Sequence, residues 1–164
     1  MPRAILLAMV TIGAFFGIAQ AKGDLFYCQI GQKHLSLTVS DGQLKYEYGP
    51  EGAPELTLES PLTGGTASWR YDLYNRAENK MLRFQRGNYS YVVFNIWSAP
   101  NSDMTGARDF SGVLVFKAGK EISRRFCNDG GVFETEIDLS MMPDAGDKLS
   151  ELIANIEEPK AADD

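Results

Sequence analysis

The stretch "DLFYCQIGQKHLSLTV", Asp24–Val39, contains Cys28, one of the two cysteines of the chain, and the first run of alternating apolar and polar residues. In this run Leu35, Leu37 and Val39 are separated by single polar residues. A period of two is expected for a β-strand with one buried face. The stretch therefore predicts that the fold begins as β-structure.

The same pattern continues along the chain in short segments separated by glycine and proline. Asp41 and Gly42 are typical of a hairpin turn, because glycine accepts a positive φ. The segment Tyr89–Trp97 is apolar on both faces, which indicates a central strand. Further expected strands are "LKYEY" (44–48), "ELTLES" (55–60), "KMLRFQ" (80–85), "SGVLVFK" (111–117) and "EISRRFC" (121–127). We predict an all-β fold, a small antiparallel β-barrel or sandwich of about seven to nine strands.

The C-terminal part of the chain has a different pattern. It contains four apolar residues at helical spacing, namely Leu149, Leu152, Ile153 and Ile156. This spacing predicts one amphipathic helix over 147–156 that packs against the β-structure, with Asp144 as its N-cap. The domain is therefore expected over 22–140, followed by an acidic tail, 141–164, that carries the helix.

The N-terminus has the three parts of a secretory signal peptide. Arg3 provides a positive start, an apolar run follows over Ile5–Ile18, and Ala19-Gln20-Ala21 has the small residues of a cleavage site. A membrane anchor is the alternative, but a helix needs about 20 apolar residues to cross a bilayer. We expect cleavage after residue 21, no membrane span, and a periplasmic or secreted protein.

Export determines how the two cysteines are interpreted. In an oxidising compartment, two thiols in a small domain usually pair. We therefore predict a disulfide between Cys28 and Cys127, joining the first and last strands of one sheet. A reactive thiol or an intermolecular bridge is the alternative, but neither cysteine has the C-x-x-C neighbour of redox motifs.

Charge is distributed unevenly along the chain. Residues 22–128 contain 13 Lys and Arg against 11 Asp and Glu, whereas residues 129–164 contain 2 against 11. Without residues 1–21, which include one basic residue, the net charge becomes −7. The chain has no cluster of basic residues that would indicate nucleic-acid binding. We expect a monomer whose protein partner, if it has one, is cationic.

The residues that usually carry chemistry are sparse. His34 is the single histidine, so neither a Ser/His/Asp set nor a zinc site can be assembled around further histidines or free thiols. The segment "NSDMTG" (101–106) begins like a calcium loop, but its twelfth position is Gly112 in place of the required Glu. We therefore expect no catalytic residues, no metal, no cofactor and no enzymatic activity.

Two connections rich in small polar residues are the expected binding loops. They are Ser60–Ser68 and Ser98–Phe110, the longest connections between expected strands. Long loops in a compact β-domain often carry function, although loops without a role are commoner. In the binding hypothesis, glycines allow close backbone approach, and exposed Met104 or Phe110 enters a cleft of the partner. The candidate binding residues are Thr63, Gly64, Gly65, Asn101, Asp103, Met104, Arg108 and Phe110.

The order of these motifs resembles known protein groups. "FYC", the alternating hairpin, "YEYGPEGAPELTL", "GNYSYVVF" and "SGVLVFKAGKEISRRFC" look like small bacterial periplasmic proteins with two cysteines, over residues 25–127. More distantly, the layout is similar to that of the periplasmic inhibitors of c-type lysozyme, which are small barrels. Those inhibitors have a Ser-Gly-x-x-Tyr type motif, where this chain has "TGGTASWRY" (63–71). This segment departs from the motif, so the resemblance assigns no inhibitory residue to this chain.

Three classes of function follow from these observations. A non-enzymatic binding module is favoured, including an inhibitor of a cationic hydrolase such as lysozyme, because a β-scaffold with two polar loops suits recognition. A structural or stress-related envelope protein is the first alternative. A small hydrolase is the second, because carboxylate pairs can act as acid and base in glycosidases.

Overall fold

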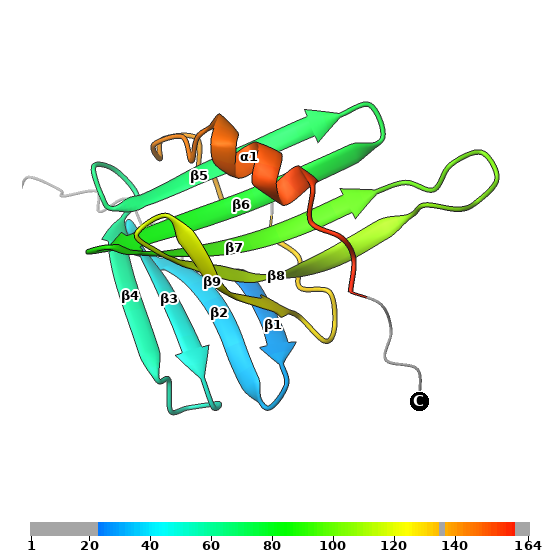
Figure 1. The fold of residues 1–164 in the computed structure, drawn as a ribbon. Coiled ribbons are helices and arrows are strands. Elements are labelled where there is room, and N and C mark those ends of the chain that lie inside the picture. Colours follow the sequence, from blue (N-terminus) through cyan, green and yellow to red (C-terminus); the bar gives the residue numbers. More distant parts are fainter. Residues whose placement is uncertain (1–22, 135–136, 160–164) are drawn as a thin grey trace, which may run out of the picture.

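Two antiparallel sheets pack face to face in the computed structural model, which describes residues 23–134 and 137–159 (Figure 1). The expected signal peptide, 1–21, lies outside the described residues. The sheets do not close into a barrel, so of the two predicted architectures the sandwich is correct. One short helix, α1, lies against the five-stranded sheet (Figure 1).

The four-stranded sheet, here the small sheet, is a meander in the order β1-β2-β3-β4. Its first two hairpin turns are short, and Asp41 and Gly42 join β2 to β3 with φ angles of 52° and 73°. Two positive φ angles match the twist of the flanking strands, so the predicted hairpin is confirmed. The strands are β1 (Gly23–Ile30), β2 (Lys33–Ser40), β3 (Gln43–Gly49) and β4 (Leu56–Pro61).

The five-stranded sheet, here the large sheet, continues the meander in the order β5-β6-β7-β8-β9. Its middle strand is β7, as the apolar segment "YSYVVFNIW" predicts. The first strand, β5, is not among the strands expected from the sequence pattern. The strands are β5 (Ala67–Tyr74), β6 (Ala77–Arg86), β7 (Tyr89–Ser98), β8 (Arg108–Lys117) and β9 (Lys120–Phe126).

Both faces of the large sheet are covered, which explains why β7 is largely apolar on both of its faces. Its inner face packs against the small sheet, where Val93 and Leu82 are fully buried with Leu35 and Leu37. Its outer face packs against the helix and the segment that leads to it. A strand that is buried on both faces of its sheet needs apolar residues at consecutive positions, because successive side chains point to opposite faces.

The helix α1 (Asp147–Ala154) confirms the predicted amphipathic element, which starts at residue 147 as expected and ends at Ala154 instead of residue 156. Its buried positions include Leu149 and Ile153, which pack on the outer face of the large sheet. The expected N-cap, Asp144, is wrong: Gly146 occupies that position with a φ of 93°. The Asp144 carboxylate instead accepts a hydrogen bond from the Gly146 N–H at 2.5 Å. The helix starts directly after Gly146, at Asp147.

The predicted disulfide between Cys28 and Cys127 is present, with Cα atoms 5.6 Å apart and a sequence separation of 99. The expectation that it joins two strands of one sheet is wrong. Cys28 lies in β1 of the small sheet, whereas Cys127 directly follows β9 of the large sheet. Because the chain changes sheets after β4, its first and last strands share no sheet, and the bond holds the two sheets together. It fits a chain that folds in an oxidising compartment.

Candidate functional site

The two expected binding loops lie at opposite ends of the large sheet (Figure 1). The first, expected over Ser60–Ser68, is a loop only over 62–66, and β5 begins at Ala67, which pairs with Phe84. The second, expected over Ser98–Phe110, is a loop only over 99–107, and β7 ends at Ser98, which pairs with Ala77. Seven residues of β6 separate these two levels, which corresponds to about 23 Å of strand. The two loops therefore do not form one surface, and binding through either of them stays a prediction.

The glycines of the first loop serve its own turn. A Cβ atom added at Gly65 would lie 2.1 Å from Ser60 Oγ and 2.3 Å from the Pro61 carbonyl oxygen. Ser60 Oγ also accepts a hydrogen bond from the Ala67 N–H at 3.0 Å. Thr63 and Gly64 are exposed at the tip. Gly65 is thus explained by close packing within the turn.

The second loop is likewise closed by its own hydrogen bonds. The Asn101 N–H donates to the Thr105 carbonyl oxygen at 2.7 Å, and the Met104 N–H donates to the Asn101 carbonyl oxygen at 2.9 Å. The Asp103 carboxylate accepts hydrogen bonds from the Thr105 hydroxyl and N–H, which lower the pKa of Asp103. Met104 is 79% exposed. Of the two proposed apolar anchors, Met104 is available to a partner.

The expectation that Phe110, the other proposed anchor, is exposed is wrong. It is 5% exposed and makes edge contacts with Phe94 and Phe126 on the outer face of the large sheet. Arg108 lies over the Phe110 ring and donates hydrogen bonds to the carbonyl groups of Ala154 and Ile156 at the end of α1. Both residues therefore hold the helix end against the sheet, since that end presents unpaired carbonyl groups.

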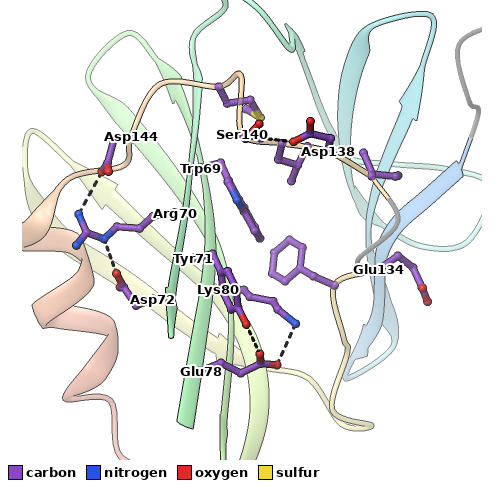
Figure 2. Close-up of a pocket in the computed structure, with 14 residues that line it drawn as sticks. Trp69, Arg70, Tyr71, Asp72, Glu78, Lys80, Glu134, Asp138, Ser140 and Asp144 are labelled. Carbon is purple, nitrogen blue, oxygen red and sulfur yellow. Dashed lines mark hydrogen bonds and ion pairs between the residues drawn. The ribbon is translucent and has the colours of Figure 1, made fainter. Parts of the chain in front are cut away.

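A cleft of about 950 Å³ lies along the outer edge of β5, between this strand and the chain that leads to the helix (Figure 2). Trp69 and Tyr71 face one side of the strand, and Arg70 and Asp72 face the other (Figure 2). The cleft therefore follows the strand edge and includes both of its faces. The remaining lining residues are Glu78, Lys80, Phe133, Glu134, Ile137, Asp138, Leu139, Ser140, Met142 and Asp144.

Aromatic side chains form the floor on the inner side. Trp69 contacts Phe133 edge to face, with ring centroids 5.2 Å apart. Phe133 in turn packs on Phe26 of β1, with centroids 4.8 Å apart. Trp69 is thereby anchored to the core between the sheets, while Tyr71, two residues further along β5, is 46% exposed. The floor changes from buried to exposed along the strand.

Tyr71, Glu78 and Lys80 form a hydrogen-bonded group next to this floor. The Tyr71 hydroxyl donates to one carboxylate oxygen of Glu78 at 2.8 Å, and the Lys80 ammonium donates to the other at 3.0 Å. Burial works to raise the pKa of Glu78, but these two hydrogen bonds outweigh it and hold the pKa below its usual value. The Lys80 side chain is 8% exposed. Glu78 is thus a fixed negative charge near neutral pH.

Arg70 organises the outer side of the cleft. Its guanidinium lies 2.7 Å from Asp72, 2.7 Å from Asp147 and 3.3 Å from Asp144. The hydrogen bond to Asp72 is the main cause that raises the pKa of Arg70. Asp72 also accepts a hydrogen bond from the Ser150 hydroxyl of α1. These ion pairs and hydrogen bonds connect β5 to α1, so they help to hold the helix in place.

The cleft has an excess of negative charge. Its lining contains five carboxylates and two basic side chains. Both basic groups are already paired, Arg70 with aspartates and Lys80 with Glu78. Within 23–134 and 137–159, no basic side chain pairs with Glu134 or Asp138. Hydrogen bonds from Ser140 lower the pKa of Asp138, so it stays ionised. These two carboxylates are available for a cationic group.

The described part of the chain contains no group of three or more side chains placed to hold a metal ion. Its helix is too short to cross a membrane. The two carboxylates of the cleft that lack a basic partner, Glu134 and Asp138, belong to the segment that follows the disulfide, which has no sequence motif. The cleft offers aromatic faces, carboxylates and a strand edge, which are groups that can bind a ligand.

Sequence reasoning missed this cleft entirely. One signal was present, because in "SWRYDLY" (68–74) Trp69, Tyr71 and Leu73 alternate with Arg70 and Asp72. That is a strand with an aromatic and apolar face. No local pattern shows that the segment before the helix bonds to this strand at Trp69. Comparisons with protein families, curated proteins and solved structures found no match for this chain, so the resemblance to lysozyme inhibitors stays a prediction.

Proposed function

We propose that this chain is a periplasmic or secreted, non-enzymatic binding module that takes a cationic group of a protein partner into the cleft along β5. The location is supported by the signal-like N-terminus and by the disulfide between Cys28 and Cys127. The site is a different one from the loops expected from the sequence.

The observation that carries the proposal is that Glu134 and Asp138, two carboxylates without a basic partner among the described residues, line the same cleft as Trp69 and Tyr71. A lysine or arginine side chain is attracted both by carboxylates and by the face of an aromatic ring. The net charge of −6 acts in the same direction at long range, because it speeds encounters with cationic proteins. A basic hydrolase such as c-type lysozyme is one partner with this chemistry.

The test measures binding to a panel of basic proteins that includes a c-type lysozyme, with a neutral protein as a control. The cleft variant is Glu134→Gln with Asp138→Asn. Its matched control is Glu51→Gln with Glu59→Gln, which removes the same charge from exposed positions of the small-sheet side. We expect the cleft variant to weaken binding by about tenfold and the control variant to have a much smaller effect.

Two results would overturn the proposal. One is the absence of binding to every basic protein of the panel at micromolar concentration. The other is an equal loss of affinity in the cleft and control variants, because that would assign binding to overall charge. Lysis by the lysozyme, measured with and without the protein, separately tests whether binding to this partner inhibits it.

A further inference from the structure

The outer edge of β5 alternates between residues that bond to β6 and residues that point away from it. The backbone groups of Trp69 point away from β6. Its N–H donates to the Pro143 carbonyl oxygen at 2.9 Å, and its carbonyl oxygen accepts a hydrogen bond from the Ala145 N–H at 3.2 Å. β5 pairs with β6 without a bulge. Because the pattern of an antiparallel ladder repeats every two residues, Tyr71 and Leu73 also direct their N–H and C=O groups outward.

The chain itself occupies the first part of this edge and then leaves it. Trp69 and Asp144 form an isolated parallel bridge, so the C-terminal segment adds one short strand there. At Gly146, with a φ of 93°, the chain turns away into α1. Within the described ranges, no backbone group bonds to the outward-facing groups of Tyr71 and Leu73. The edge is therefore open beyond Trp69.

The outer edge of β1 shows the usual alternative, a covered edge. There the Asn128 N–H donates to the Gln29 carbonyl oxygen at 2.7 Å, and the Glu134 N–H donates to the Leu25 carbonyl oxygen at 2.8 Å. Natural sheets normally cover or charge an exposed edge, because it otherwise pairs with another chain. On β5 the two charged residues, Arg70 and Asp72, are paired with each other. They give this edge little protection.

The open edge adjoins the cleft. Four consecutive residues of β5, from Trp69 to Asp72, line the cleft, and they include Tyr71, where the open part of the edge begins (Figure 2). Directly beyond it, Leu73 is 71% exposed and Tyr74 is 49% exposed. A bound strand would cover these apolar side chains.

We propose that the edge of β5 from Tyr71 to Tyr74 binds an extended, basic peptide segment of the partner, which pairs with β5 as a further strand. This inference rests on the proposed function and specifies how the partner is held. Backbone hydrogen bonds provide affinity in such strand addition, and alternate side chains provide specificity. Basic side chains on the inner face of the added strand would lie toward Glu134 and Asp138.

Charge distinguishes this occupant from a second copy of the chain. Pairing two β5 edges would bring together two clefts that each have an excess of carboxylates, in a protein with a net charge of −6. Like charges oppose that association, whereas a lysine-rich or arginine-rich strand neutralises them. A basic extended peptide is therefore the occupant that the edge favours.

The experiment compares two fluorescent peptides with the full chain. One is a short peptide of alternating lysine and valine, and the other has the same sequence with every backbone amide N-methylated. Both have the same side chains and charge, but the second lacks backbone donors. We expect the methylated peptide to bind about tenfold more weakly or worse, because strand pairing depends on main-chain hydrogen bonds.

A pair of variants tests the same point from the side of the protein. Leu73→Pro removes the outward N–H, at an edge position where proline is tolerated because no ladder bond is lost. Leu73→Ala removes the side chain and keeps the N–H. Peptide affinity should fall about tenfold in L73P and much less in L73A, with melting curves confirming that both fold. If L73P does not fold, the two peptides decide the question on the unmodified chain.

Failure of this inference and failure of the proposed function give different results. Equal binding of both peptides, weakened equally by Glu134→Gln with Asp138→Asn, would overturn strand addition and keep the acidic cleft as the site. The absence of peptide binding, with basic proteins still bound through the cleft, would also overturn strand addition. Peptide binding that does not respond to the cleft variant would overturn the proposed function.

Discussion

Cys28 and Cys127 join the small sheet to the end of the large sheet across 99 sequence positions, with Cα atoms 5.6 Å apart. Cys28 is fully buried among the core residues between the sheets. The bond therefore closes almost the whole β-domain into one covalent loop. In the unfolded chain such a loop strongly restricts the accessible conformations.

Replacing both cysteines, Cys28→Ser with Cys127→Ser, should lower the free energy of unfolding by about 2 to 5 kcal/mol. Chemical denaturation of the oxidised protein and of the variant measures the difference. The oxidised protein should also show no free thiol after denaturation. Two titratable thiols in protein purified from an oxidising compartment would contradict the bond and the interpretation of the compartment.

Much of the fold was predictable because its signals are local. The alternation of Leu35, Leu37 and Val39, and the turn at Asp41 and Gly42, depend on a few neighbouring residues and on one buried face. The largely apolar segment of β7 is also a local signal, since burial on both faces makes most of its positions apolar, with Asn95 as a buried polar exception. These elements were assigned correctly.

The strand β5 was missed because its environment changes along its length. Ala67 and Ser68 are both buried, whereas Tyr71, Leu73 and Tyr74 are exposed. The strand starts between the sheets and continues past the point where the small sheet covers it. A fixed period of buried residues is therefore absent, although the side chains alternate in type.

The arrangement of the two sheets and the cleft was not predictable from local pattern. Two cysteines indicate that two segments lie close together, but not whether their strands share a sheet. The cleft exists because Pro143 and Ala145 bond to Trp69, more than 70 positions away in sequence. Phe110 shows the same limit, since its burial depends on a helix that forms later in the chain.

Acid should weaken the fold in part through Glu78. Burial works to raise its pKa, but hydrogen bonds from Tyr71 and Lys80 outweigh it and hold the folded-state pKa below the usual value of 4.5. The ionised Glu78 carboxylate therefore contributes to stability above pH 4.5, and this contribution is lost as the pH falls through the lower pKa of the folded state. Glu78→Gln should lower stability by about 1 to 2 kcal/mol at pH 7.

The same variant should lose less stability than the unmodified protein as the pH falls from 5 to 3, because the variant has one ionised carboxylate fewer to protonate. Urea unfolding at each pH measures both curves. Tyr71→Phe is the matched control, because it removes one of the two hydrogen bonds and keeps the carboxylate. Parallel curves for the E78Q variant and the unmodified protein would show that Glu78 has no depressed pKa.

The docking of α1 depends on apolar burial and should be insensitive to salt. Ile153 is fully buried against the outer face of the large sheet, whereas Glu151, two residues earlier, is exposed. Ile153→Ala should therefore lower the free energy of unfolding by about 2 to 4 kcal/mol, through lost burial and the cavity that remains. Glu151→Ala, the control, should change it by less than about 0.5 kcal/mol. Denaturant curves at low and high salt measure both effects, and a loss in I153A that disappears at high salt would assign the docking to the Arg70 ion pairs instead.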